Sequence, residues 1–276
     1  MSDNNTAQGA KLAQSARLAQ GAGLEHEAAR RRREHCAQLD RCNQRGGRML
    51  SMLDLLDAGA LDVDLAAWLM AGVSRGASFM VGARPGGAGK TTVMCALANL
   101  VPPDVELIAA TDDAIALGLR ETKSPRRCYV CHEIGAGPYY CYLWDDALRA
   151  YCSLSEKGHI LATNLHADDL AEARRRVCDD NGVPERHFNA FHILVFLRVE
   201  SGFMRARRRI EKVYLSDGAS PHQLAYDSRK GLLLPPPAPE EWFARCRAFL
   251  EENLKTGART IEEVRDLLLK LDGSKG

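Results

Sequence analysis

The sequence predicts an α/β protein whose mainly parallel sheet carries helices on both faces. Short apolar runs alternate with stretches of helical spacing through most of the chain, as expected of parallel strands joined by crossover helices. One such run, at residues 79–81, enters a glycine-rich turn that leads into a helix. The length of 276 residues allows one substantial domain with smaller flanks.

Composition and charge narrow the class of protein. The formal net charge of +1 at pH 7 offers no overall electrostatic reason to bind nucleic acid or a membrane. The sequence has no apolar run of about 18 residues and no basic start followed by an apolar stretch, so we expect neither a membrane span nor a secretion signal. Nine cysteines without such a signal fit a reducing cytoplasm better than a disulfide framework. We therefore expect a cytoplasmic protein.

Residues 1–47 are predicted to form a mobile and helical N-terminal extension. Residues 24–45 are charged and helix-prone, and they include the run Arg30–Arg33. Such a run can bind nucleic acid or acidic lipid, but its acidic neighbours favour a solvated helix face. A helix over 49–57 and a second one that ends at Val73 then lead into the first strand.

Residues 48–234 are predicted to form the α/β core, and residues 235–276 a proline-rich linker with a small helical appendage. The capping box Thr260–Glu263 opens the last helix. The expected helices after the first strand cover 93–100, 114–119, 143–155, 168–177, 240–254 and 260–271. The expected strands cover 79–81, 105–110, 128–134, 159–166, 191–199 and, as an edge strand, 207–214.

The glycine-rich turn predicts a cradle for phosphate groups. Gly-Lys-Thr-Thr stands between an apolar strand and a helix, where backbone N–H groups and the helix N-terminus can point at an anion. Lys90 would meet the β- and γ-phosphates, and the Thr91 hydroxyl would bind Mg²⁺. Arg84 occupies the position of the first glycine in the Gly-x4-Gly-Lys-Thr pattern. The residues expected to bind nucleotide are Pro85, Gly86, Gly87, Ala88, Gly89, Lys90, Thr91 and Thr92.

Two neighbouring carboxylates follow the second expected strand. Asp112 and Asp113 come directly after the run 105–110 and Thr111. At the carboxyl end of a strand beside a phosphate loop, they are well placed for metal or water chemistry. Thr-Asp-Asp is also good capping chemistry for a helix that begins near Ala114. The two roles are compatible.

The segment Cys128–His132 matches the Cys-x-x-Cys-His pattern of covalent haem attachment. It lies in an expected core strand, where alternation points Cys128 and Cys131 to opposite faces. Zinc ligation by this segment with Cys141, and a redox dithiol within it, are disfavoured for that reason. We expect buried free cysteines that pack as small apolar side chains.

Four motifs in this order resemble those of the type II/type IV secretion and pilus motor ATPases, a superfamily of P-loop NTPases with a RecA-like core. The resemblance covers about residues 48–218, and its most specific part is the histidine box Gly158–Asp168. The other matching segments are the phosphate loop Arg84–Thr92, the acidic box Ile108–Asp113 and the Walker-B-like Val130–Ile134, preceded by similar helices at Leu53–Leu69.

The resemblance implies an ATP-hydrolysing motor that uses Mg²⁺. It is expected to work as a ring, a hexamer, and to act on inner-membrane platform proteins of a secretion or pilus system. The protein would then be cytoplasmic and peripheral at the inner membrane through these partners. Lys90 would bind the β- and γ-phosphates, Thr91 the Mg²⁺, and Thr92 would support the phosphates.

The resemblance also implies roles for carboxylates and histidines. In the family, a glutamate of the acidic box polarises the attacking water, and here that box holds only Asp112 and Asp113. Glu133 would be the Walker-B carboxylate, a Mg²⁺ ligand and the reserve candidate for the base. His159 and His166 would sense the γ-phosphate side and couple hydrolysis to movement.

Departures from the family keep other hypotheses open. Arg84 breaks the loop pattern, the acidic box lacks glutamate, and about eight residues around Gly135–Tyr142 are inserted. A nucleotide-dependent assembly or switch protein with little hydrolysis is the second hypothesis. A DNA-acting motor, disfavoured by the near-neutral charge, and a small-molecule kinase are further ones. An arginine acting on a neighbouring subunit's γ-phosphate would come from Arg126, Arg127, Arg174–Arg176 or Arg205–Arg209.

Overall fold

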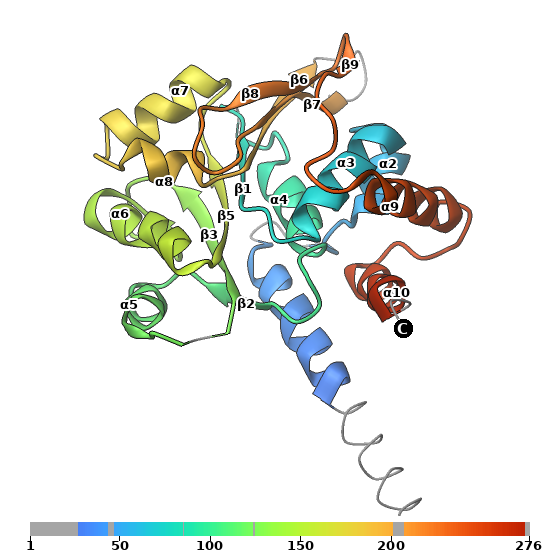
Figure 1. Ribbon diagram of the computed structural model, residues 1–276, viewed down its shortest axis with the longest axis horizontal. Coiled ribbons are helices and arrows are strands. Elements are labelled where there is room, and N and C mark those ends of the chain that lie inside the picture. The colour runs from blue at the N-terminus through green and yellow to red at the C-terminus, as the bar shows by residue number, and fades with distance from the viewer. Residues whose placement is uncertain (1–26, 44–46, 85, 124, 201–206, 274–276) are drawn as a thin grey trace, which may run out of the picture.

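The computed structural model describes residues 27–43, 47–84, 86–123, 125–200 and 207–273. Within these residues one sheet has the strand order β2-β3-β5-β1-β6-β7-β8-β9, with β4 beside β3 (Figure 1). The strands are β1 Phe79–Gly82, β2 Glu106–Ala109, β3 Arg127–Ile134, β4 Tyr142–Leu143, β5 Ile160–Leu165, β6 Ile193–Glu200, β7 Arg207–Leu215, β8 Gln223–Asp227 and β9 Gly231–Leu232.

The described helices begin with residues 27–41, called the N-terminal helix below. The others are α2 Met52–Asp57, α3 Val63–Val73, α4 Lys90–Ala98, α5 Asp112–Arg120, α6 Asp145–Ser153, α7 Leu170–Arg174, α8 Glu185–Asn189, α9 Glu240–Asn253 and α10 Ile261–Gly273. A 3-10 turn at Leu154–Lys157 follows α6, and a π-helical turn at Arg175–Asp179 follows α7. In this part of the chain, no helix is both long and apolar enough to span a bilayer.

The sheet is mostly parallel, as the sequence predicts. The strands β2, β3, β5, β1 and β6 run parallel to one another, whereas the pairs β6–β7, β7–β8 and β8–β9 are antiparallel. The strand β1 lies between β5 and β6, with Phe79 opposite Ala162 and Ile193. The carboxyl ends of the parallel strands therefore meet at one edge of the sheet, where the loop after β1 begins.

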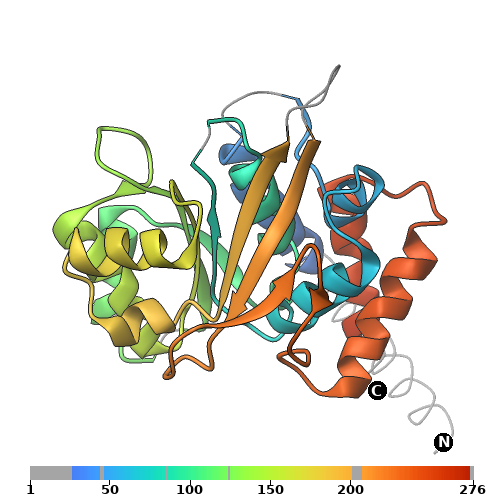
Figure 2. The ribbon, with the colours of Figure 1, turned by 90° about the horizontal axis from the view of Figure 1, so that it is seen from above.

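Helices cover both faces of the sheet, which confirms the predicted two-sided burial. Along β1, Phe79 and Val81 belong to one buried cluster, and Met80 belongs to the other. The first cluster includes residues of α2, α3, α4, α9 and α10, and the second includes residues of α5, α6, α7 and α8. Figures 1 and 2 show these two groups of helices on opposite sides of the sheet. Alternating side chains of a fully buried strand supply both cores.

The prediction that residues 207–214 form an edge strand is wrong in part. The carboxyl half of β7, from Lys212 to Leu215, pairs with β8 across the turn at Ser216–Gly218. Among the described residues, the half that begins at Arg207 pairs with β6 and has no β8 partner. The short segment Gln223–Asp227 lacks a strong apolar alternation, so the sequence did not reveal it as a strand.

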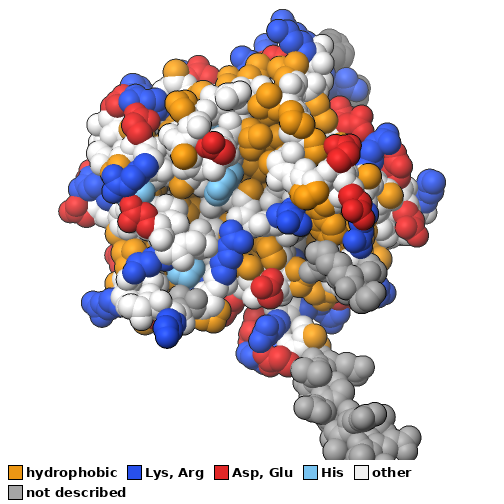
Figure 3. All heavy atoms as spheres, in the orientation of Figure 1, with side chains coloured by type: hydrophobic (Ala, Val, Ile, Leu, Met, Phe, Trp, Pro, Cys, Tyr) orange, Lys and Arg blue, Asp and Glu red, His pale blue; other side chains and the backbone are white. Residues whose placement is uncertain are grey.

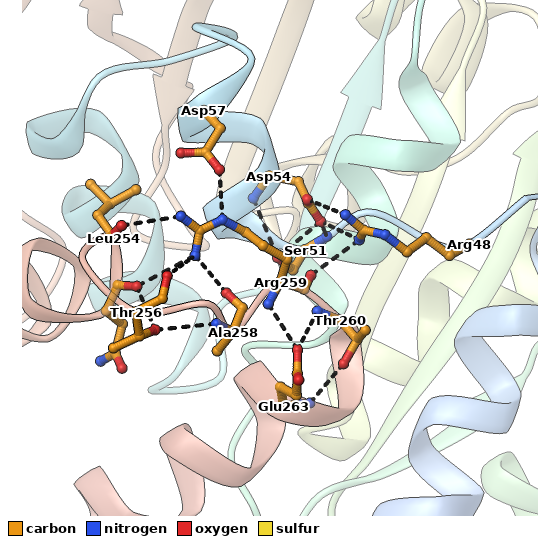
Figure 4. A network of polar contacts seen from close by, with 11 residues as sticks. Arg48, Ser51, Asp54, Asp57, Leu254, Thr256, Ala258, Arg259, Thr260 and Glu263 are labelled. Carbon is orange, nitrogen blue, oxygen red and sulfur yellow. Dashed lines mark hydrogen bonds and ion pairs between the residues drawn. The ribbon is translucent and has the colours of Figure 1, made fainter.

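The last two helices share the core of the first cluster. Trp242 of α9 donates a hydrogen bond to the Ser74 hydroxyl at 3.0 Å, directly after α3. Before α10, the Arg259 side chain bonds Asp57 at 2.6 Å and the carbonyls at the end of α9 (Figure 4). The predicted capping box of α10 is confirmed, because Thr260 and Glu263 exchange hydrogen bonds.

Candidate functional site

The loop after β1 has the geometry of a phosphate cradle. It runs from Ala83 to Gly89, and α4 begins directly at Lys90. Gly87 and Gly89 have φ of +81° and +96°, a region that glycine adopts without steric cost. The N-terminus of α4 therefore opens at the loop, and the first N–H groups of a helix have no partner within the helix itself. Pro85, one of the residues expected to bind nucleotide, lies outside the described residues.

A close packing contact holds the start of this loop. A Cβ at Gly82 would lie 2.7 Å from the Ala167 carbonyl oxygen and equally close to the Phe196 ring. Only glycine fits there, because real Cβ atoms do not approach a backbone oxygen so closely. The loop thus begins against the segment that follows β5.

Lys90, Glu133 and His166 converge at the carboxyl edge of the sheet. The Lys90 Nζ lies 3.9 Å from Glu133 Oε2 and 3.3 Å from His166 Nδ1. His166 Nε2 lies 2.6 Å from Glu133 Oε1. Lys90 and Glu133 are 7% and 8% exposed, and charges buried to this degree require such pairing. Three elements, α4, β3 and the end of β5, supply the three groups.

His166 also holds the loop backbone. Its Nδ1 lies 2.8 Å from the Arg84 carbonyl oxygen, while its Nε2 faces Glu133. The two ring nitrogens therefore lie against two acceptors, a backbone carbonyl and a carboxylate. His166 therefore couples the carboxylate of β3 to the position of the phosphate loop.

Asn164 joins this group, and the sequence did not single it out. Its amide donates to the His132 carbonyl at 3.0 Å and lies 3.4 Å from the Thr91 hydroxyl. Asn164 is fully buried in β5, and its Oδ1 has no partner among the described residues. A buried amide in an otherwise apolar strand was the signal that could have revealed it.

The oxygen groups here suit Mg²⁺ held together with a nucleotide. Mg²⁺ is usually bound through one or two protein oxygens, with waters and substrate phosphates completing the octahedron. Thr91 offers a hydroxyl at the first turn of α4, and Glu133 offers a carboxylate. Asn164, whose amide nitrogen lies beside Thr91, offers an amide oxygen that has no partner among the described residues. The described residues contain no cluster of three acidic, histidine or cysteine side chains that would hold a metal on its own.

Arg84 is anchored rather than left in solution. Its backbone N–H donates to Asp168 Oδ1 at 2.6 Å, and its guanidinium donates to Glu172 Oε1 at 2.9 Å. Burial alone would raise the pKa of Glu172, but the hydrogen bond and charge of Arg84 outweigh it, and that pKa is lowered. From β7, Arg208 donates to the Gly87 carbonyl at 2.8 Å. The sequence suggested Asp168 and Glu172 only as part of a helix start, and Arg208 only as part of a basic cluster.

Asp112 and Asp113 lie at the same edge but are not brought to Lys90. They form the first turn of α5 after β2, and both are exposed. Because β3 and β5 lie between β2 and β1, two strands separate them from the phosphate loop. The capping interpretation is confirmed, since the Thr111 hydroxyl accepts from the Ala114 N–H.

His159 lies at the opposite end of β5 from His166. Six strand residues separate them, which at about 3.3 Å per residue places them roughly 20 Å apart. His159 Nδ1 accepts a hydrogen bond from the Arg127 N–H at 3.3 Å, and its ring packs edge-on against Tyr129. Burial, followed by the positive charge of Arg127, lowers the pKa of His159. Within one chain, the structure does not bring His159 into the site.

The cysteines of the Cys-x-x-Cys-His segment lie as alternation predicts. Cys128 belongs to the first buried cluster and Cys131 to the second, on the other face of the sheet. Burial raises the pKa of both thiols to about 12. These two side chains therefore pack as small apolar groups.

Among the arginines considered for action on a neighbouring subunit, Arg126, Arg127 and Arg174–Arg176 have side-chain partners within the chain. Arg126 donates to the Gly158 and Gly76 carbonyls, and Arg127 pairs with Glu121. The side chains of Arg174–Arg176 pair with nearby carboxylates. Arg205 lies outside the described residues.

Comparisons with known proteins give a limited likeness. No protein-family model and no curated protein sequence matches the chain. Among solved structures, it is similar to the VirB11 ATPase from the Brucella suis type IV secretion system, determined in complex with sulphate, with TM-score 0.42 and 18% identity over 59% of this chain and 54% of that chain. It is also similar to the Legionella pneumophila ATPase DotB, with TM-score 0.39 and 11% identity over 84% of this chain and 64% of that chain. The chain thus spans 54% and 64% of these two chains, and at such TM-scores we draw no functional conclusion from the likeness.

Proposed function

We propose that the chain is a P-loop ATPase with a RecA-like core that binds Mg²⁺-ATP and hydrolyses it. The observation that carries this proposal is the convergence of Lys90, Glu133 and His166 beside a glycine loop at the N-terminus of α4. A lysine at the first position of that helix, facing a buried carboxylate from another strand, is an arrangement with which P-loop NTPases hold phosphates and Mg²⁺.

The residues of the chain would divide the chemistry as follows. The loop N–H groups and Lys90 bind and orient the phosphates, and Thr91 and Glu133 hold Mg²⁺. The metal, when bound, neutralises charge that develops on the phosphate oxygens. Lys90 exchanges its contact with Glu133 for phosphate oxygens, and Glu133 then orients the attacking water. Asp112 and Asp113 lie two strands away, so we assign the water-orienting role to Glu133.

His166 would link the nucleotide to the rest of the chain. It contacts both Glu133 and the Arg84 carbonyl, so a change at the carboxylate alters the hold on the loop. In this proposal the chain works as a hexameric ring whose movement drives inner-membrane platform proteins of a secretion or pilus system.

A nucleotide-binding switch with little hydrolysis is the second candidate function. The observation that favours it is the anchoring of Arg84 to Asp168 and Glu172, which ties the loop where the usual pattern has a glycine. A tied loop can hold phosphates and yet restrict the motion that turnover needs. A DNA-acting motor has less support, since positive and negative side chains are interspersed over the face shown in Figure 3.

Steady-state Mg²⁺-ATP hydrolysis by the purified chain tests the proposal, beside Lys90→Ala and Glu133→Gln. We expect turnover above background that both substitutions abolish, with ATP binding lost in Lys90→Ala and retained in Glu133→Gln. Binding by the wild type without turnover above that of Lys90→Ala, at concentrations that allow a ring, would refute the motor and leave the switch. Absence of nucleotide binding would refute both.

A further inference from the structure

Arg208 lies beside the phosphate loop, although it belongs to β7, which is distant from the loop in the sequence. Its Nε donates a hydrogen bond to the Gly87 carbonyl at 2.8 Å. A Cβ added at Gly89 would lie 3.5 Å from Arg208 Cδ, so the aliphatic part of the side chain packs against Gly89. Alternation along β7 places Arg208 on the same face as Ile210, which is buried in the cluster that contains α4. The guanidinium therefore lies next to the residues that directly precede Lys90.

Arg208 differs from the other two cations at this loop, because it has no carboxylate partner among the described residues. Lys90 faces Glu133 at 3.9 Å, and the Arg84 guanidinium donates to Glu172 at 2.9 Å. Arg208 is exposed, and its side chain forms one hydrogen bond in the described part of the chain, to a backbone carbonyl. A guanidinium carries five N–H donors in a rigid fork, and that carbonyl takes the donor on Nε. The donors at the end of the fork thus remain for an anion.

Other arginines of the β6–β7 pair do have carboxylate partners. Arg198 pairs with Glu211 at 2.6 Å, and Arg209 pairs with Glu200 at 3.5 Å. Arg209 is the residue next to Arg208, and alternation places it on the opposite face of the strand. It therefore supplies a control residue with the same charge on the same strand, directed away from the loop.

The strand order indicates which part of a nucleotide Arg208 would meet. The strands β3 and β5, which carry Glu133 and lead to His166, lie on one side of β1, and β6 and β7 lie on the other side. In the proposed function, Glu133 orients water at the γ-phosphate, so the reacting end of the nucleotide lies toward β3. Arg208 approaches the loop from the opposite side, where the remaining phosphates would lie.

We propose that Arg208 binds the phosphates that remain in the ADP product, and so sets the affinity for nucleotide rather than the rate of hydrolysis. This inference rests on the proposed nucleotide site. The planar fork pairs with two phosphate oxygens at once, which a point charge does not do. An interaction that is equally strong in the bound substrate and in the transition state lowers KM and leaves kcat unchanged.

The test is titration of the purified full chain with Mg²⁺-ADP and with Mg²⁺-ATP, followed by isothermal calorimetry, beside Arg208→Gln. In this variant the new amide nitrogen occupies the position of the arginine Nε, so the hydrogen bond to Gly87 is kept and only the charged end is lost. We expect both nucleotides to bind at least about tenfold more weakly. Turnover at saturating ATP should stay within about threefold of the wild-type value.

Two further variants separate the fork from charge alone. Arg208→Lys keeps the charge without the fork and should recover part of the lost affinity, to about threefold below wild type. The matched control Arg209→Gln removes the same charge from the opposite face and should bind ADP within about twofold of wild type. Circular dichroism establishes that each variant is folded.

Three outcomes would overturn the role of Arg208. The first is a folded Arg208→Gln chain that binds ADP as the wild type does. The second is an equal loss of ADP affinity in Arg209→Gln, which would indicate an effect of overall charge. The third is a loss of ATP affinity and turnover without a loss of ADP affinity, which would place Arg208 at the γ-phosphate. A wild-type chain that binds ADP without hydrolysing ATP would refute the ATPase and leave the role of Arg208 intact, whereas a wild type that binds no nucleotide would refute both.

Discussion

The two ends of β5 carry histidines in similar sequence settings and in different surroundings. At the carboxyl end, His166 contacts a carboxylate from β3 and the lysine that begins α4. At the amino end, His159 contacts the backbone of Arg127 and the ring of Tyr129. The first histidine belongs to a group of buried charges, and the second completes the hydrogen bonding of the sheet edge.

The topology explains this difference. In a parallel sheet, the carboxyl ends of all strands meet at one edge, and the helices that follow begin there with free N–H groups. At the opposite edge, helices end and strands begin, and polar side chains there form hydrogen bonds with backbone groups. Arg126 at that edge donates to the Gly76 and Gly158 carbonyls in this way. We therefore expect chemistry to depend on the carboxyl edge and stability on both.

Replacement of the buried carboxylate should have the largest effect. Glu133→Gln is expected to reduce ATP turnover at least about 100-fold, because the neutral amide neither orients water nor holds Mg²⁺ as well. Asp112→Asn, at the same edge but two strands away, should change turnover less than about threefold. Steady-state hydrolysis measures both. A larger loss in Asp112→Asn would place the base on β2 and contradict our assignment.

A methyl group added at the carboxyl edge of the sheet should destabilise the fold more than one added at the amino edge. Gly82→Ala places a Cβ against the Ala167 carbonyl, and we expect about 2 kcal/mol of lost stability. Gly158→Ala meets no atom within 4 Å but requires a residue at φ +78°, which costs about 1 kcal/mol. Urea unfolding compares the two. Equal losses of stability in the two variants would show that the segment after β5 shifts to accommodate the added methyl group.

The histidines themselves give the most direct comparison. His166→Asn should lower turnover about tenfold, since it breaks the link between Glu133 and the loop. His159→Asn should leave the turnover of a single chain within about twofold of the wild-type value. If hydrolysis falls only at concentrations where subunits associate, then His159 acts across a subunit boundary.

A smaller effect should appear in the pH dependence of stability. The pKa of His159 is lowered, first by burial and then by Arg127. Below about pH 6.5 the unfolded chain binds a proton that the folded chain does not, so this contribution is constant above that pH and stability falls as the pH decreases below it. His159→Asn should therefore lose less stability than wild type as the pH falls from about 7.5 to about 5.5. Identical slopes in urea unfolding would show that His159 is protonated in the folded chain.

Local pattern was sufficient for much of the fold. The apolar runs predicted β1, β2, β3, β5 and β6, because short apolar runs bounded by turn residues are typical of buried strands. The strand β7, which begins with three arginines, was predicted as an edge strand. Capping chemistry predicted the start of α10 at Thr260. The pattern missed β8, which is short and half exposed, and hence the neighbour of β7.

What the sequence by itself determined is the glycine-rich loop between β1 and α4 and the residue types beside it, since glycines, a lysine and a threonine at fixed spacing act within one turn of chain. The tertiary structure alone decided which distant groups join that loop. Asn164, Arg208 and Asp168 reach it through strand order and register, and His159 does not, because seven residues along one strand reach from one edge of the sheet to the other. Contacts between elements are set by packing across the whole core, and no local spacing encodes them.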